Sequence, residues 1–128
     1  RDVYSRTFGG LQAYGATGAT VLEELVDAAF QACGVAHSQR EATGAAVLTE
    51  GNRVYAGCSV ESRHRPELSV AAERTAVLKA VSEGETRFRA LVLASDCGGE
   101  DFPVPDGASR QFLAEYGNSP VCLVNQHL

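Results

Sequence analysis

The sequence has no C-x-x-C pair among its four cysteines, no apolar run of membrane-spanning length and no secretory signal. The missing C-x-x-C spacing argues against a zinc knuckle. The missing apolar segments argue against a membrane span or an exported chain. Basic residues are also not in excess, because 16 acidic and 11 basic side chains give a net charge of −5. We therefore expect neither nucleic acid nor membrane as a partner.

The remaining composition is that of a single globular domain. The chain has 128 residues, of which 45% are hydrophobic and 21% charged, so it is long enough to bury a core. The cysteines, Cys33, Cys58, Cys97 and Cys122, lie in apolar or small-residue stretches. Buried reduced thiols explain them and indicate a cytoplasmic protein. We expect an N-terminal arm over residues 1–19, rich in Gly, Ala and Thr, and a domain over residues 20–128.

Hydrophobic periodicity and turn residues predict alternating helices and strands. A capping-box pattern at Thr20 and Glu23 predicts the start of a helix that ends at Gly34. Further helices are expected over 69–82 and 107–116, and strands over 45–49, 53–60, 90–94 and 120–124. This order predicts an α/β domain with a mixed sheet and helices on its faces.

Two segments carry the chemical signal of the chain. They are Leu68-Ser69-Val70-Ala71-Ala72-Glu73-Arg74-Thr75-Ala76 and Pro105-Asp106-Gly107-Ala108-Ser109-Arg110-Gln111. The first resembles the Val-Cys-Ala-Glu-Arg-Thr-Ala segment of the free cytidine deaminase family, and the second resembles its Pro-Cys-x-x-Cys-Arg-Gln segment. Residues 44–48, 55–62 and 80–84 resemble further stretches of that family in the same order. The resemblance implies a cytidine deaminase-like three-layer α-β-α sandwich.

Three positions in these segments depart from the family. Zinc deaminases use a Cys or His, two further Cys and a catalytic Glu. Here the ligand places hold Ala71, Asp106 and Ser109, whereas the Glu is kept as Glu73. Alanine has no donor atom, and a hydroxyl is a poor zinc ligand. Because zinc is what lowers the pKa of the attacking water to about 7, we expect no metal, no other cofactor and no ordinary cytidine deamination.

The two acidic residues are the expected catalytic pair. We interpret Glu73 as a general acid/base, although the first turn of a helix also favours a carboxylate electrostatically. Asp106 is either the N-cap of the third helix, worth about 1 kcal/mol, or a partner that splits the two pKa values. Ser109 either helps to cap the same turn or holds a water molecule.

The expected substrate-binding residues also differ from the family. Ser59 and Glu61 stand where the family holds the ribose hydroxyls with Asn and Glu, and Glu41 stands where a Phe packs on the base. Arg63 and His64 lie in a basic loop that is either solvated, a subunit contact or a clamp for a carboxylate or phosphate. With Ala71 and Ser109, these residues favour a polar or cationic substrate over a plain pyrimidine nucleoside.

Together these expectations describe a zinc-independent enzyme of the hydrolase or cyclase/lyase type. Glu73 would transfer protons on a small nitrogen-rich or nucleoside-like metabolite, by C–N hydrolysis, cyclisation, dehydration or isomerisation, in specialised metabolism. Two alternatives stay open: a non-catalytic paralogue that binds a small molecule, and a nucleoside deaminase with an atypical metal site. The resemblance also implies a homotetramer or homodimer with residues 61–67 near a subunit boundary.

Overall fold

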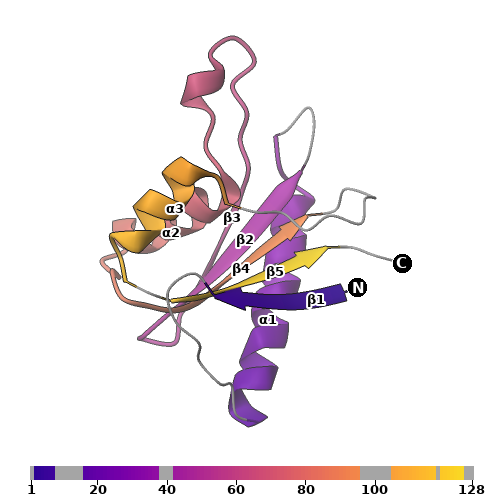
Figure 1. Ribbon diagram of the computed structural model, residues 1–128, viewed down its shortest axis with the longest axis vertical. Helices are drawn as coiled ribbons and strands as arrows, with labels where there is room; N and C mark the ends of the chain where they lie inside the picture. Colours follow the sequence, from indigo (N-terminus) through magenta and orange to yellow (C-terminus); the bar gives the residue numbers. More distant parts are fainter. Residues whose placement is uncertain (1, 8–15, 38–41, 96–104, 118, 126–128) are drawn as a thin grey trace.

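A computed structural model describes the backbone of residues 2–7, 16–37, 42–95, 105–117 and 119–125, and the side chains of 21–37, 42–95, 105–117 and 119–124. Five strands form one sheet in the order β1-β5-β4-β2-β3. β4 and β5 are parallel, and the other neighbouring strands are antiparallel. Helix α1 covers one face, whereas α2 and α3 cover the other (Figure 1). The expected three-layer α-β-α sandwich with a mixed sheet is confirmed.

The elements have the following bounds. The strands are β1 (Asp2–Thr7), β2 (Thr43–Thr49), β3 (Val54–Cys58), β4 (Phe88–Ser95) and β5 (Pro120–Asn125). The helices are α1 (Ala16–Cys33), α2 (Ala72–Ser82) and α3 (Gly107–Ala114), with a short 3-10 helix over Pro66–Leu68. Within the described ranges, no helix is both long enough and apolar enough to cross a membrane.

The N-terminal part differs from the sequence-based expectation in two respects. Residues 2–7, expected to be irregular, form β1 and pair with β5. Helix α1 begins at Ala16, so Thr20 lies inside it and does not cap its start. Alanines at 16 and 19 are strong helix formers and favour this earlier beginning. The division between an arm and a domain at residue 20 stays a prediction.

The central strands are buried on both faces because helices cover both sides of the sheet. Ala46 and Val92 pack on the α1 side, whereas Val47 and Leu93 pack on the α2 side. Neighbouring residues of a strand point to opposite faces. A strand that is covered on both sides therefore reads as a continuous apolar run, which is the pattern at 45–48 and 90–94.

Gly57 sets how closely α2 approaches β3. A Cβ atom at this position would lie 2.4 Å from the backbone nitrogen of Ala76 and 2.8 Å from the Cβ of Thr75. Both separations are shorter than real Cβ contacts, so only glycine fits without a shift of the helix. This close contact fixes the position of α2, which carries Glu73 in its first turn.

Candidate functional site

Glu73 is a buried carboxyl group at the start of α2. It follows the N-cap residue Ala71, whose backbone is extended, and only 3% of Glu73 is exposed. Burial raises the pKa of Glu73, and the charge of Asp106 adds to this rise, whereas the backbone N–H of Glu73 and the Ser109 hydroxyl oppose it. The carboxyl group of Glu73 therefore holds its proton to a higher pH than an exposed glutamate does.

Asp106 caps α3 and lies on the exposed side of the same cluster. Its Oδ1 accepts a hydrogen bond from the backbone N–H of Ser109 at 2.7 Å, which confirms the N-cap interpretation. This hydrogen bond is the main reason why the pKa of Asp106 is lowered, and the Ser109 hydroxyl contributes in the same direction. Because the charge of Asp106 also acts on Glu73, the cap residue belongs to the surroundings of Glu73 as well.

The pKa values of the two carboxyl groups move apart, but mutual repulsion is not the main cause. Burial is the largest effect on Glu73, and the helix-capping hydrogen bond is the largest effect on Asp106. Repulsion by the charge of Asp106 makes a smaller contribution to the raised pKa of Glu73. The different surroundings of the two side chains thus raise the pKa of Glu73 and lower that of Asp106.

Ser109 contributes a buried hydroxyl with no standard hydrogen bond. Its exposure is 0%, and its Oγ has no hydrogen-bond partner of ordinary geometry among the described residues. The hydroxyl is nevertheless close enough to both carboxyl groups to lower the pKa of each. An unsatisfied buried hydroxyl costs about 1–3 kcal/mol, so a polar atom of a ligand or water placed here would be stabilising.

Arg74 also belongs to the cluster around Glu73, although the sequence did not predict it there. Its charge lowers the pKa of both Glu73 and Asp106. Its Nη2 donates to the carbonyl of Ser69 at 3.3 Å, and its buried Nε has no hydrogen-bond partner among the described residues. Its position directly after Glu73 was the only sequence signal for this role.

The two residues expected to bind a ribose, Ser59 and Glu61, differ in their burial and in their hydrogen bonds. Ser59 is only 8% exposed, and its Oγ accepts from the Thr43 N–H at 3.1 Å and donates to the Thr43 carbonyl at 3.4 Å. This hydroxyl therefore holds β2 to the end of β3. Glu61 is partly exposed, and its N–H donates to the His37 carbonyl at 2.7 Å. Glu41 lies outside the described residues.

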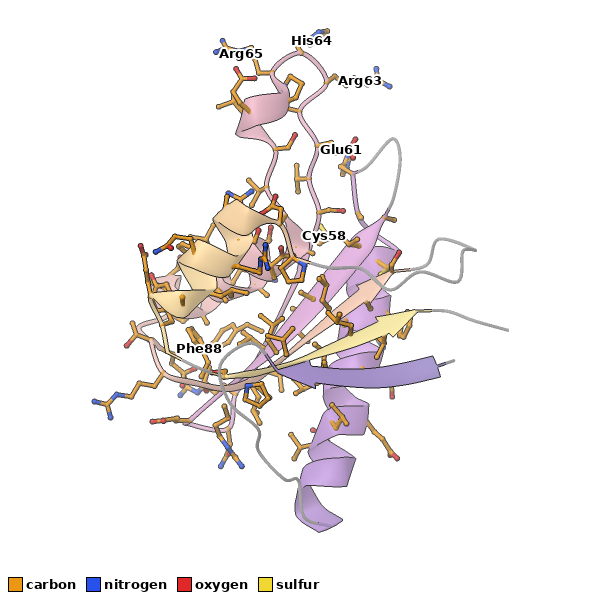
Figure 2. The ribbon with its side chains drawn as sticks, viewed as in Figure 1. Cys58, Glu61, Arg63, His64, Arg65 and Phe88 are labelled. Carbon is orange, nitrogen blue, oxygen red and sulfur yellow. The ribbon has the colours of Figure 1, made fainter. Side chains whose placement is uncertain are left out.

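Arg63 and His64 lie far out on a loop. Residues 60–70, which we call the projecting arm, leave the sheet after β3 and return to α2, with Val60 and Val70 paired at its base (Figure 2). Arg63 and His64 are exposed at its tip. In the described part of the chain, no hydrogen bond, ion pair or charge effect links them to Glu73, so a single chain does not bring them into the cluster.

The resemblance assigns three positions to the zinc ligands, and the side chains at these positions are poor ligands for that metal. Ala71 offers no donor atom, Asp106 uses its carboxylate to cap α3, and Ser109 offers a neutral hydroxyl. Among the described residues, no group of three His, Cys, Asp or Glu side chains is placed to hold a metal ion.

Comparison with known proteins identifies the family. No protein-family model matches the chain. The chain is 41% identical over 105 residues to a probable cytidine deaminase of Dictyostelium discoideum, covering 80% of this chain and 70% of that protein. It is 45% identical over 85 residues to a cytidine deaminase of Sporosarcina psychrophila, covering 64% of this chain and 60% of that protein.

Solved structures agree with this relationship. A cytidine deaminase from Burkholderia pseudomallei matches with a TM-score of 0.75 and 31% identity, over 81% of this chain and 84% of that one. A cytidine deaminase from Mycobacterium tuberculosis matches with a TM-score of 0.68 and 34% identity, over 82% and 84% of the two chains. The chain belongs to the cytidine deaminase family.

Family membership corrects the expected function. The hypothesis of a zinc-independent enzyme for a metabolite other than a plain pyrimidine nucleoside is wrong, because the relatives are named cytidine deaminases and this family's reaction depends on zinc. The substrate part of that hypothesis relied on Ser59 and Glu41. Ser59 is bound to the backbone of Thr43, and Glu41 lies outside the described residues, so neither supports a substrate of another class.

Proposed function

We propose that this protein binds cytidine-type pyrimidine nucleosides, with the base facing Glu73. The observation that carries the proposal is the buried carboxyl of Glu73, with its raised pKa, in a chain of the cytidine deaminase family. A protonated carboxyl group has one donor and one acceptor. The cytosine edge presents an acceptor at N3 beside a donor at N4, so the two groups are complementary.

Ser109 and Asp106 support this arrangement in different ways. The buried hydroxyl of Ser109 lacks a standard hydrogen bond and gains one when a polar ligand atom lies beside it. The Asp106 carboxylate holds the first turn of α3, and with it the backbone of Ser109, in place. The ligand therefore meets a preformed polar surface at the beginnings of two helices.

The proposal includes the loss of the zinc ligands of the family. A methyl group, a capping carboxylate and a neutral hydroxyl stand at Ala71, Asp106 and Ser109. We therefore assign nucleoside recognition to these side chains. Purified protein should carry well below one zinc ion per chain at this place, as measured by elemental analysis. Stoichiometric zinc that is lost together with nucleoside binding on chelation would contradict this assignment.

Hydrolytic deamination of the bound cytidine to uridine and ammonia is the second candidate function. The family membership of the chain favours it, as does the position of Glu73, a group that can carry a proton. The measurement is uridine formation from cytidine in buffer supplied with zinc, followed by absorbance. Glu73→Gln provides the baseline because an amide cannot carry the proton.

Calorimetric titration with cytidine tests nucleoside recognition. Glu73→Gln should keep an affinity near that of the wild type, because an amide also offers one donor and one acceptor towards N3 and N4. Glu73→Ala should weaken binding by roughly tenfold, since it leaves buried polar groups of the base unpaired. Glu83→Ala, at the exposed C-terminal end of α2, is the matched control and should change nothing. Equal affinities of the wild type and Glu73→Ala for cytidine would disprove recognition by Glu73.

We also propose a homodimer or homotetramer in which the projecting arm lies at a subunit boundary. The arm exposes two large apolar side chains, Leu68 at 63% and Val60 at 43%. Burial of such side chains between subunits is favourable. Light scattering should give a multiple of the chain mass, and Leu68→Asp should shift it towards the monomer. A monomeric wild-type protein at micromolar concentration would refute this assembly.

A further inference from the structure

A cavity that contains none of the Glu73 cluster lies between the C-terminal half of α3 and the sheet. Its volume is about 130 Å³. Val77 of α2, Phe88 and Leu91 of β4, and Leu113 of α3 form apolar walls, and Tyr116 lies just beyond the end of α3. The nucleoside proposed above makes no use of this space.

The size and walls of the cavity suit one aromatic ring. Apolar cavities of about 150 Å³ inside proteins bind benzene. The rings of Phe88 and Tyr116 meet edge to face, with centroids 5.7 Å apart and planes at 68°. The rings of Phe112 and Tyr116 meet in the same way, with centroids 5.3 Å apart and planes at 65°. A ring in the cavity would extend this edge-to-face packing, which is favourable beyond the burial of its area.

Arg110 gives the cavity its charge. It lines the cavity, is exposed, and is the only charged residue among the described residues that line it. Its charge lowers the pKa of Asp106, but within the part of the chain that the structure describes its guanidinium makes no side-chain hydrogen bond or ion pair. The hydroxyl of Ser119, another lining residue, already donates to the carbonyl of Phe88 at 2.8 Å. Arg110 can therefore offer its guanidinium to a ligand at the rim of the cavity, and a guanidinium pairs best with a planar carboxylate.

We infer that this cavity binds a small aromatic acid, with its ring between α3 and the sheet and its carboxylate on Arg110. The ring supplies the apolar contact, and the charge at the rim fixes the orientation. The site requires no metal and no second chain.

Backbone amide NMR titrations with three probes test the inference. Phenylacetate should shift the amide signals of Leu113, Tyr116 and their neighbours. Phenylacetamide, which has the ring but no charge, should bind roughly three- to tenfold more weakly, because an ion pair at an exposed rim contributes modestly. Acetate, which has the charge but no ring, should cause no saturable shift at these residues.

Variants separate the contribution of the charge from that of the ring. Arg110→Gln should lower the affinity for phenylacetate to that for phenylacetamide and leave the latter unchanged. Arg53→Gln, the same change at an exposed arginine that does not line the cavity, is the control and should have no effect. Ala114→Leu narrows the cavity from an exposed helical position that tolerates leucine, so it should weaken both aromatic probes.

Three results would overturn the inference. The first is equal affinity of the wild type for phenylacetate and phenylacetamide. The second is unchanged phenylacetate binding in Arg110→Gln. The third is a shift of the cavity signals with protein concentration alone, together with no response to any probe, because a second copy of the chain would then cover the cavity.

Discussion

The buried carboxyl of Glu73 should lower the free energy of unfolding of this protein as pH rises above 4.5. The Glu73→Gln variant should lack this pH dependence. The pKa of Glu73 is raised in the folded protein above the ordinary value of 4.5. As pH rises past 4.5, the unfolded chain releases the proton while the folded chain keeps it. The unfolded state is then favoured, so this group reduces the free energy of unfolding until the folded carboxyl also ionises. Above that pH the reduction is constant.

The magnitude follows from the number of protons involved. One proton held by the folded state alone changes the free energy of unfolding by at most about 1.4 kcal/mol per pH unit. Glutamine has no such proton. The difference in stability between Glu73→Gln and the wild type should therefore move in favour of glutamine as pH rises above 4.5 and then level off. Asp106 titrates in both proteins, so most of its contribution cancels in the difference.

Urea denaturation at half-unit intervals of pH measures this difference. Glu67→Gln is a matched control, because the backbone N–H of Glu67 and the side chain of Arg65 lower the pKa of that exposed carboxyl. The difference in free energy of unfolding between Glu67→Gln and the wild type should not move in favour of glutamine as pH rises. A flat difference for Glu73→Gln across the range would refute the argument, and so would a difference that moves in favour of glutamate.

Three further predictions concern other parts of the fold. Asp106→Ala should lower the free energy of unfolding at neutral pH by about 1 kcal/mol in urea titrations, whereas Asp106→Asn, which still caps α3, should lower it less. Gly57→Ala should cost about 1–3 kcal/mol or more because its Cβ meets the α2 backbone, and the control Gly107→Ala, with nothing within 4 Å, should cost little. The thiol of Cys122, whose pKa burial raises to about 11, should resist iodoacetamide at pH 8 in folded protein, as read by mass spectrometry.

The sequence predicted the parts of the fold that depend on local pattern. The apolar runs at 45–48 and 90–94 became the central strands, and the two motif segments became the beginnings of α2 and α3. Because helix N-termini favour capping residues, the sequence predicts Asp106 as an N-cap of α3, and the hydrogen bond from the Ser109 N–H confirms it. The resemblance of both motifs to one family was sufficient for the three-layer architecture.

Other features depend on contacts between distant residues and have no local pattern. β1 is stabilised by pairing with β5 at the other end of the sheet, so the Gly-rich composition around it gave no sign of a strand. The sequence alone allows the side chain of Ser59 to contact a ribose, but the fold places it against the backbone of Thr43. Similarly, the cavity beside Arg110 exists only because α3 meets the sheet at a particular place.

The pairing of β1 with β5 also bears on how this chain folds. β2, β3, α2 and β4 follow one another along the chain and contact their sequence neighbours, so they can assemble early. β5 reaches its parallel place beside β4 only through the α3 crossover. β1 can pair only after β5 is in place, and nearly the whole described chain separates the two strands. Closing so long a loop carries a large entropic cost, so the first strand along the chain is expected to be the last to join the sheet.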